Sequence, residues 1–551
     1  MAITNTKFLG RNMTLMVELT PGMNNFATVG GMRGHSVSVG NAEIDITDKD
    51  DDTWKKLLSG GIRTLGVNGS GLITNNSAYT ALQNANQNGT PINAKLLFKS
   101  GQAYVAPFLI NSLALSGEYN GAQQFTVSMA SMNSPYIGIG SATPTLDFQF
   151  DQSGSIQPTL GTATLTMTRS TSALYRDVDG ILKTAAANVA RFECDANGNR
   201  MGYLPEPQST NLLLQSQTFD NASWTKVNAT ATVGAAVAPD GTATTEKLVD
   251  TASNTGHYFN QAQSKAASAI QYTASVFLKA ADLSWAALQI DDNTANGYQI
   301  FANLTTGALG TLAQIGSNFT GASATIKPYN NGWYRLTLTV TSNTATTINV
   351  IIRLSTGDLV QTYAGSTQGV YLWGAQLEVQ PQETSYIATT TAQVTRSADV
   401  LTATSITGIS TTVGTLEAEA YEPASSSTST PSLASLNDGT NSNSELVYKT
   451  SSNGVDACLA SVASATQANP TASPPSLGAL NKIAFAFQAS NFGASFGGAA
   501  AQQVSSGTVA ATMNQLNIGH AVGSQQWGRP IKRLSYYAAR AINSDLVALA
   551  S

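Results

Sequence analysis

The sequence predicts a mainly β protein built from several β-sandwich domains. Short runs of alternating β-branched and aromatic residues, separated by Gly, Asn, Pro and Asp, recur along the chain, whereas helical periodicity is scarce. The 551 residues exceed what one hydrophobic core usually serves. Only 11% of the residues are charged, so Ser, Thr, Asn, Gln and Gly must cover the surface. Such a surface is typical of extracellular proteins and of particle surfaces.

The charge balance excludes nucleic-acid recognition through a basic surface. The chain has 28 Lys+Arg against 33 Asp+Glu, a net charge of −5, and no basic stripe. It has no apolar run of membrane-spanning length, and its start lacks a signal-peptide pattern, so we expect a chain that is made in the cytoplasm and crosses no membrane. The two cysteines and three histidines are too dispersed in the sequence to predict a metal site, a cofactor or a disulfide framework. They are Cys194, Cys458, His35, His257 and His520.

The first 140 residues are predicted to form one β-sandwich domain with a flanking helix. A helix is expected after the acidic run, capped by Asp51 or Asp52, because Trp54, Leu57 and Leu58 share one helical face. Further helices are expected at Asn76–Asn86 and Ser544–Ala550. The predicted strands are Ser36–Thr47, Ile62–Asn68, Ala94–Phe98, Ala103–Ala114 and Gln124–Met132. A Pro/Ser/Thr-rich junction at Ser134–Thr145 marks the boundary.

Residues 1 to about 138 resemble the major tail (tail-tube) protein family of long-tailed bacteriophages. The pieces that carry the resemblance are Val29–Arg33, Val39–Thr47 leading into Trp54–Leu58, Leu115–Gly121 and Phe125–Ser131. The resemblance implies a β-sandwich that assembles into stacked, hexameric rings around a DNA conduit. It also implies the tape measure and tail terminator proteins as partners, transient passage of DNA, assembly in the host cytoplasm and a final location in the virion tail.

A ring-stacking loop is expected between the first strands. There a Gly-bounded alternating strand runs into a charged loop, as expected of an arm that becomes ordered against a neighbour. The residues assigned to this loop are Asn41, Glu43, Asp45, Asp48, Asp50 and Asp51. A lining that lets DNA slide must avoid Lys and Arg, because phosphate neutralisation would hold the DNA, so we expect an acidic, amide-rich channel.

The rest of the chain resembles two kinds of sugar-binding sandwich. Residues 205–400 resemble carbohydrate-binding-module-like jelly rolls through Pro207–Ser216, Phe219–Trp224, Asn331–Leu336 and Gly369–Glu378. Residues 401–551 resemble concanavalin-A-like (laminin-G-like) sandwiches through Gly414–Tyr421, Lys482–Phe487 and Pro530–Tyr537. The connecting segment, residues 141–204, is expected to lend a strand to the lectin-like sandwich, which would make that domain discontinuous.

Two aromatic residues are the candidates for glycan binding. An exposed ring on a loop or concave sheet can stack on a pyranose face, and Trp285 and Tyr298 are placed to do so. The alternative for each ring is a place in the core or an incidental place on the surface. Glu417, Glu419 and Glu422 read E-x-E-x-x-E, close to the E-x-D-x-x-E strand motif of retaining glycosidases. The middle Asp is replaced by Glu, and the segment Pro423–Ser429 supplies no aromatic subsite walls, so a solvated strand face is the favoured interpretation.

Together these patterns favour a structural tail-tube subunit, not an enzyme, whose C-terminal domains decorate the tube and are candidates for binding host surface glycans. The alternative is a glycan-binding adhesin or tail fibre component in which the first domain only anchors the others. The hypothesis that the chain is a glycosidase depends on Glu417 and Glu419 alone.

Overall fold

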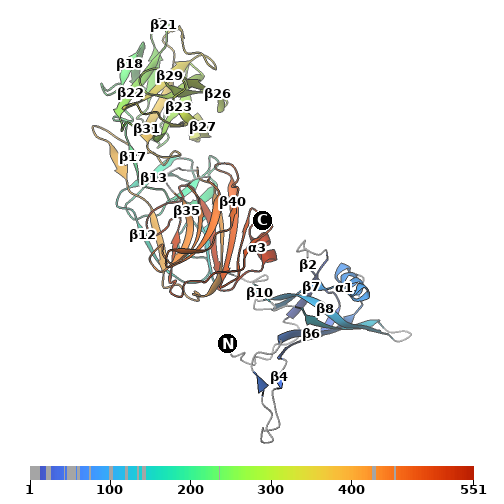
Figure 1. Cartoon of the computed structure of the whole chain (residues 1–551). Helices are drawn as coiled ribbons and strands as arrows, with labels where there is room; N and C mark the ends of the chain where they lie inside the picture. The colour runs from blue at the N-terminus through green and yellow to red at the C-terminus, as the bar shows by residue number, and fades with distance from the viewer. Residues whose placement is uncertain are drawn as a thin grey trace.

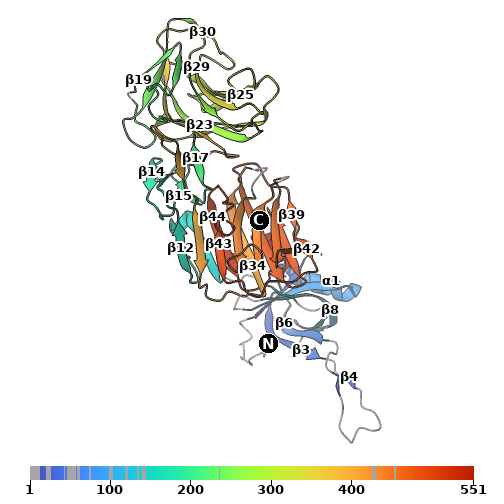
Figure 2. The same cartoon turned by 60° about the vertical axis from the view of Figure 1, so that its left-hand side comes forward.

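The structure is a computed structural model that describes residues 13–19, 26–41, 44–45, 57–58, 63–73, 76–98, 103–117, 122–132, 136–138, 144–234, 236–424, 430–451 and 454–551. Antiparallel sheets dominate these residues, which confirms the prediction of a mainly β fold. Figures 1 and 2 show three bodies in a row: the N-terminal part, a middle body that contains the C-terminus, and a body formed by the central residues at the far end.

The N-terminal part is a sheet in the order β2-β1-β7-β8-β9-β6-β3, with β10 paired to β8. Its strands are β1 (Met13–Glu18), β2 (Phe26–Thr28), β3 (Met32–Asn41), β6 (Arg63–Leu72), β7 (Ile92–Phe98), β8 (Ala103–Ser116), β9 (Gln124–Ser131) and β10 (Tyr136–Gly138). Alternate residues of β6 and β9, such as Val67 and Val127, are buried in one core with Leu15 of β1.

Helix α1 (Ser77–Asn88) covers this core with Tyr79 and Leu82. It forms where the sequence predicts a helix at Asn76–Asn86, and the Asn76 side chain caps it by accepting a hydrogen bond from the Tyr79 N–H at 2.8 Å. The helix predicted to contain Leu57 and Leu58 is wrong at those residues. They form strand β5 (Leu57–Leu58), which pairs with β4 (Ile44–Asp45). A helix of so few residues is marginal alone, and the partner strand satisfies the same backbone groups.

The central residues, 209–396, form the body that we call the jelly-roll module. Among its described residues, two sheets pack face to face, in the orders β18-β22-β29-β24-β25-β26 and β19-β20-β31-β23-β28-β27. Their strands are β18 (Thr225–Val227), β19 (Ala229–Val233), β20 (Glu246–Asp250), β22 (Tyr258–Ser264), β23 (Gln271–Ala280), β24 (Trp285–Asp291), β25 (Gly297–Asn303), β26 (Ala308–Ile315), β27 (Thr320–Pro328), β28 (Tyr334–Thr341), β29 (Thr347–Ser355) and β31 (Gly369–Glu378). The short β21 (Asn254–Thr255) pairs with β30 (Tyr363–Ala364), and a 3-10 turn spans Asn330–Gly332.

The middle body, which we call the split sandwich, combines residues 146–203 with residues 400–551. One sheet has the order β15-β16-β44-β34-β40-β41-β42, with β11 on β44, and the other the order β12-β33-β43-β35-β36-β37-β38, with β39 on β37. The strands before the jelly-roll module are β11 (Leu146–Gln149), β12 (Thr164–Thr168), β15 (Phe192–Cys194) and β16 (Arg200–Tyr203). Those after it are β33 (Val400–Thr404), β34 (Val413–Tyr421), β35 (Ser432–Asn437), β36 (Ser444–Lys449), β37 (Asp456–Val462), β38 (Ala465–Ala468), β39 (Thr471–Ala472), β40 (Leu480–Gln488), β41 (Phe492–Phe496), β42 (Gln502–Val504), β43 (Gln515–Ile518) and β44 (Ile531–Tyr537).

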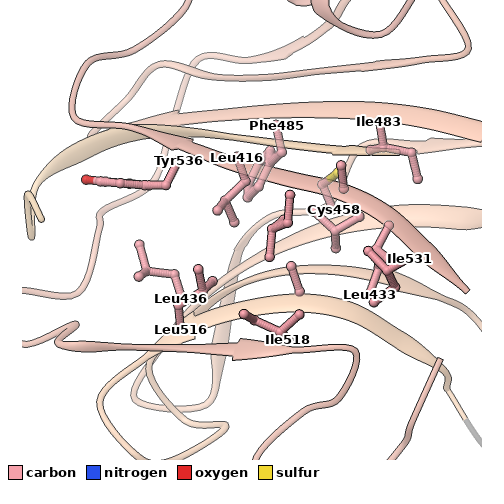
Figure 3. Close-up of a cluster of buried hydrophobic side chains, with 14 of the residues drawn as sticks. Leu416, Leu433, Leu436, Cys458, Ile483, Phe485, Leu516, Ile518, Ile531 and Tyr536 are labelled. Carbon is pink, nitrogen blue, oxygen red and sulfur yellow. The ribbon is translucent and has the colours of Figure 1, made fainter. Parts of the chain in front are cut away.

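The core of the split sandwich lies between these two sheets. Figure 3 shows Leu416, Phe485 and Tyr536 of one sheet opposite residues of the other, Leu436, Leu516 and Ile518. The segment before the jelly-roll module adds further buried side chains to the same core, namely Leu146, Phe148, Phe150 and Tyr203. Phe150 opens the short helix α2 (Phe150–Ser153), and α3 (Asn543–Leu549), which forms where Ser544–Ala550 was predicted to be helical, covers the outer face.

A narrow neck joins the jelly-roll module to the split sandwich. Strand β17 (Ser209–Asn211), where the chain enters the module, pairs with β32 (Val394–Arg396), where the chain leaves it (Figures 1 and 2). The hairpin β13 (Ala173–Arg176) and β14 (Leu182–Ala185) lies beside the neck, and Leu182 packs with Trp333 and Trp373 of the module.

Buried ion pairs hold the base of this neck. Asp399 accepts hydrogen bonds from Arg169 at 2.7 Å and from Arg191, and Glu206 pairs with Arg191 at 2.8 Å and Arg396 at 3.4 Å. The side chains of these five residues are at most 4% exposed. Because Arg169 and Asp399 are separated by the whole module in sequence, the cluster ties both ends of the module to the split sandwich.

Candidate assembly site

A strip of small polar side chains crosses one outer face of the N-terminal sheet. Ser36 of β3, Asn68 of β6 and Ser128 of β9 are aligned in register, and Ser112 of β8 pairs with Ser128. The neighbouring row holds Gly34, Ser70, Thr126 and Ala114. In each strand these residues alternate with core residues, as in Thr126-Val127-Ser128-Met129, and that alternation is the sequence signal that could have located them. Across these two rows the sheet presents hydroxyl and amide groups and no charge.

Two of the residues predicted for ring stacking lie on strands that continue β3 and β6 beyond the sheet. Strands β3 and β6 pair from Met32 to Asn41, and β4 with β5 continues the arm, which projects away from the other bodies in Figure 1. Of the residues predicted for ring stacking, Asn41 ends β3 opposite Arg63, and Asp45 pairs with Leu57. The other predicted stacking residues, Glu43, Asp48, Asp50 and Asp51, lie outside the described residues.

The C-terminal bodies meet the N-terminal part on its other side. Lys95 of β7 forms an ion pair with Asp545 of α3 at 3.2 Å. Both views show the split sandwich next to β7, β8, β10 or α1, with β4 at the far end of the molecule (Figures 1 and 2). The arm is therefore directed away from the residues that follow the first sheet.

The two predicted glycan-binding aromatics do not form one platform. Trp285 and Tyr298 lie on neighbouring strands, but Trp285 pairs with Asn303 and Tyr298 with Ile290, at opposite ends of the β24–β25 hairpin. Tyr298 shares the core face with Ile290 and packs against the module's core, whereas Trp285 points to the other face. Sequence alone does not give the strand register that separates them.

The three glutamates of the E-x-E-x-x-E motif are each engaged by basic or hydroxyl groups. Glu417 accepts hydrogen bonds from Tyr537 at 2.8 Å and Arg533 at 3.3 Å, and Glu419 pairs with Lys532 at 2.9 Å. Burial raises the pKa of Glu417. Glu422 is buried against Lys449. In this arrangement the carboxylates neutralise neighbouring cations on the sheet.

The cysteines and histidines are likewise dispersed. Cys194 and Cys458 are free and buried in different strands. His257 and His520 bond to backbone carbonyl oxygens, and His35 lies on β3. Over the part of the chain that the structure describes, no group of three or more His, Cys, Asp or Glu side chains gathers as a metal site. Within the same residues, no helix has both the length and the apolar character needed to span a membrane.

A comparison with known protein families finds a match for the N-terminal part of the chain. Residues 7–135 match the family model described as phage tail tube protein. The match covers the arm, the polar strip and helix α1, and it confirms the resemblance of this part of the chain to tail-tube proteins. No curated protein matches the chain.

Solved structures resemble separate portions of the chain. A chain from the tail of an empty gene transfer agent particle is 21% identical, with a TM-score of 0.22, and the match covers 24% of this chain and 98% of that one. The CBM40 of the Ruminococcus gnavus IT-sialidase, bound to alpha2,3 sialyllactose, is 12% identical over 26% of this chain and 84% of that one, with a TM-score of 0.22. Domains LG4-5 of the mouse laminin alpha1 chain are 10% identical over 53% of this chain and 88% of that one, with a TM-score of 0.20.

Proposed function

We propose that this chain is the structural subunit of a phage tail tube, in which stacked rings, hexameric by resemblance, form the conduit for DNA. The observation that carries the proposal is the match of residues 7–135 to the phage tail tube family. The subunit works in the virion tail, where tape measure and tail terminator proteins are its partners, and it assembles in the host cytoplasm.

The polar strip is the surface that we assign to the channel. Lys or Arg side chains on a lining would neutralise phosphates and hold the DNA in place, whereas hydroxyl and amide groups let it slide. The rows through Ser36, Asn68 and Ser128 carry no charge. The sequence predicts an acidic, amide-rich lining, and the strip that we assign to the channel has hydroxyl and amide groups but no acidic ones. The bodies formed by residues 144–551 would then project outward, since they contact the β7 side and could not share a channel with DNA.

The arm is the element that we assign to ring stacking. A two-stranded ribbon beyond the core is marginally stable alone and gains stability from a neighbouring surface. The ends of β3 and β6 beyond the β6–β9 pairing, which stops at Gly66, form such a ribbon together with β4–β5, and Asn41 and Asp45 lie on it. We extend this assignment to the acidic residues that follow Asp45 in the sequence.

Electron microscopy of the purified full-length chain tests the proposal. Tubes with a regular ring repeat are expected, and deletion of residues 41–48 should leave folded subunits that do not polymerise. Discrete monomers or trimers that bind glycan arrays would overturn the tail-tube proposal and favour the alternative of a glycan-binding adhesin or tail fibre component. If the deletion variant still forms tubes, the assignment of ring stacking to the arm is wrong, but the proposal of a tail tube stands.

The channel assignment has its own test. Thr126→Lys should slow DNA ejection several-fold, and more strongly at low salt, because counterion release favours phosphate binding as the salt concentration falls. Ser317→Lys, on an exposed turn of the jelly-roll module, adds the same charge outside the proposed channel and should leave the rate unchanged. Equal ejection rates for both variants and the parent would refute the assignment.

A further inference from the structure

A cavity of about 200 Å³ lies where the hairpin β13–β14, the jelly-roll module and the split sandwich meet. Arg176 comes from the hairpin, Lys327 and Arg335 come from the module, and Arg529 comes from the split sandwich. Carboxylates also line the cavity, at Glu193, Glu206 and Glu383. Residues so far apart in the sequence form one polar wall only because the bodies pack together at the neck.

The carboxylates of this cavity are already engaged. Glu383 pairs with Lys327 and, at 3.1 Å, with Arg529. Glu206 belongs to the buried ion pairs at the base of the neck. Glu193 accepts a hydrogen bond from the Arg176 backbone N–H at 3.0 Å and lies 3.9 Å from the Arg176 side-chain Nε, and burial raises its pKa. Glu383 is thus shared among Lys327, Arg529 and, beyond ion-pair distance, Arg335, so the cations around it outnumber it.

The last of these cations is Arg335. Its side chain is 3% exposed, and its Nε and Nη2 both donate to the Ser275 hydroxyl, at 3.2 Å and 2.8 Å. Its guanidinium lies 5.2 Å from the centre of the Phe277 ring. Among the described residues it forms no ion pair with a carboxylate. Removing a charge from water without a counter-ion is costly, so the site favours an anion.

Other atoms of the cavity offer hydrogen bonds. Arg529 Nε and Thr325 Oγ1 have no partner among the described residues. The side chains of Tyr329, Tyr386 and Tyr421 also line the wall. Arg176 lies over the Tyr329 ring at 4.6 Å, and Tyr386 packs against Trp373, so these rings shape the wall. The volume is below the roughly 300–1,000 Å³ of drug-sized ligand sites, so it admits one small unit.

We propose that this cavity binds the carboxylate of an acidic monosaccharide unit, with Arg335 as the counter-ion. Thr325, Arg529 and the engaged glutamates then bond the sugar hydroxyls. The inference goes beyond tube formation and does not depend on it, because the cavity lies wholly within residues 175–530.

Calorimetric titration of the full-length chain tests this site with N-acetylneuraminic, glucuronic and galacturonic acids, with glucose and galactose as neutral sugars, and with acetate. At least one acidic sugar should bind, at least tenfold more tightly than acetate or either neutral sugar. Arg335→Gln should weaken that binding at least tenfold. Arg353→Gln should not, since Arg353 is also buried and stacked, 4.7 Å from the Tyr258 ring, but lies outside the cavity.

Thermal unfolding of both arginine variants checks that they fold. Should Arg335→Gln not fold, the half-buried Thr325→Val is the second variant and should weaken binding several-fold. The proposal fails if no acidic sugar binds the parent chain, if neutral sugars or acetate bind equally well, or if the folded cavity variants bind like the parent.

Discussion

The N-terminal sheet and the bodies that follow it differ in how their longest elements are supported. In the first, β3 and β6 continue into an arm whose end projects away from the rest of the molecule. In the second, strands from both ends of the sequence share one core, and Asp399 and Glu206 bind arginines at the neck. The first part leaves backbone to be supported by a neighbour, whereas the second is internally braced. In the proposed function, assembly through the arm and outward projection of the later bodies make opposite demands on one chain.

The largest expected effect comes from cutting the split sandwich. A fragment of residues 401–551 lacks the fully buried Leu146, Phe148, Phe150 and Tyr203, and losing even one large core side chain costs about 3–5 kcal/mol. Four such losses are as large as the roughly 5–15 kcal/mol that stabilises a domain, so this fragment should be unfolded by circular dichroism. The fragment of residues 144–551 is the control and should unfold cooperatively. A folded shorter fragment would show that the two segments are independent.

Breaking the buried ion pairs should have the next largest effect. Asp399→Asn leaves Arg169 without its counter-ion and leaves Arg191 with Glu206 alone, and loss of one partner from a buried pair costs about 3–5 kcal/mol. Asp282→Asn removes an exposed pair with Lys247 and should cost at most about 1 kcal/mol. Urea unfolding of both variants gives the comparison. Equal losses in the free energy of unfolding would mean that the buried ion pairs do not stabilise the neck.

A smaller effect is expected from pH. Burial and then the neighbouring Glu422 raise the pKa of Asp456 to about 8. A carboxyl with a higher pKa in the folded chain than in the unfolded chain stabilises fully below the unfolded value, near pH 4, and that stability is lost as the pH rises towards 8. Asp456→Asn keeps an acceptor for the Asn481 amide, which lies 2.6 Å from Asp456 Oδ2, and should raise the melting temperature at pH 8 by several degrees.

Asp438→Asn is the opposite control for that measurement. Hydrogen bonds from Thr440 and Asn443 lower the pKa of Asp438, so its contribution is present above pH 4 and lost in acid. This variant should not gain stability at pH 8. A melting temperature of Asp456→Asn that equals the parent's at every pH would contradict the assignment.

The smallest effect concerns the N-terminal sheet. Asn76→Ala removes the cap of α1 and should cost about 1 kcal/mol in the first unfolding transition, without changing the later bodies. Asn86→Ala, on the exposed side of the same helix, should be neutral or slightly stabilising because alanine has the higher helix propensity. Equal destabilisation by both substitutions would indicate that the cap is not the cause.

Local patterns were sufficient for elements whose stability is local. The spacing of apolar residues locates both α1 and α3. Leu57 and Leu58 show the limit, because three apolar residues fit a helical face while pairing with another strand decides the outcome. The faces of Trp285 and Tyr298 likewise depend on how β24 and β25 pair and pack, which single-residue patterns do not give.

The charged groups at the neck were beyond sequence reasoning for a related cause. Arg335 lies within the Asn331–Leu336 motif, but nothing in the sequence indicates that it meets Arg529 of a different body. Arg169 and Asp399 are adjacent only because the module between them returns to its starting point. By contrast, the polar strip alternates with core residues within single strands, so its members could have been recognised in advance.

The pairing of β17 with β32 has a consequence for how such a chain changes over time. Both ends of residues 209–396 meet at one place, so this stretch is a cassette whose loss or exchange leaves the threading of the split sandwich intact. A replacement needs two termini about as close as Ser209 and Arg396, whatever lies between them. Recombination at the neck can thus exchange this module, while the surfaces proposed for ring formation, which lie in a sheet that ends at Gly138, keep their geometry.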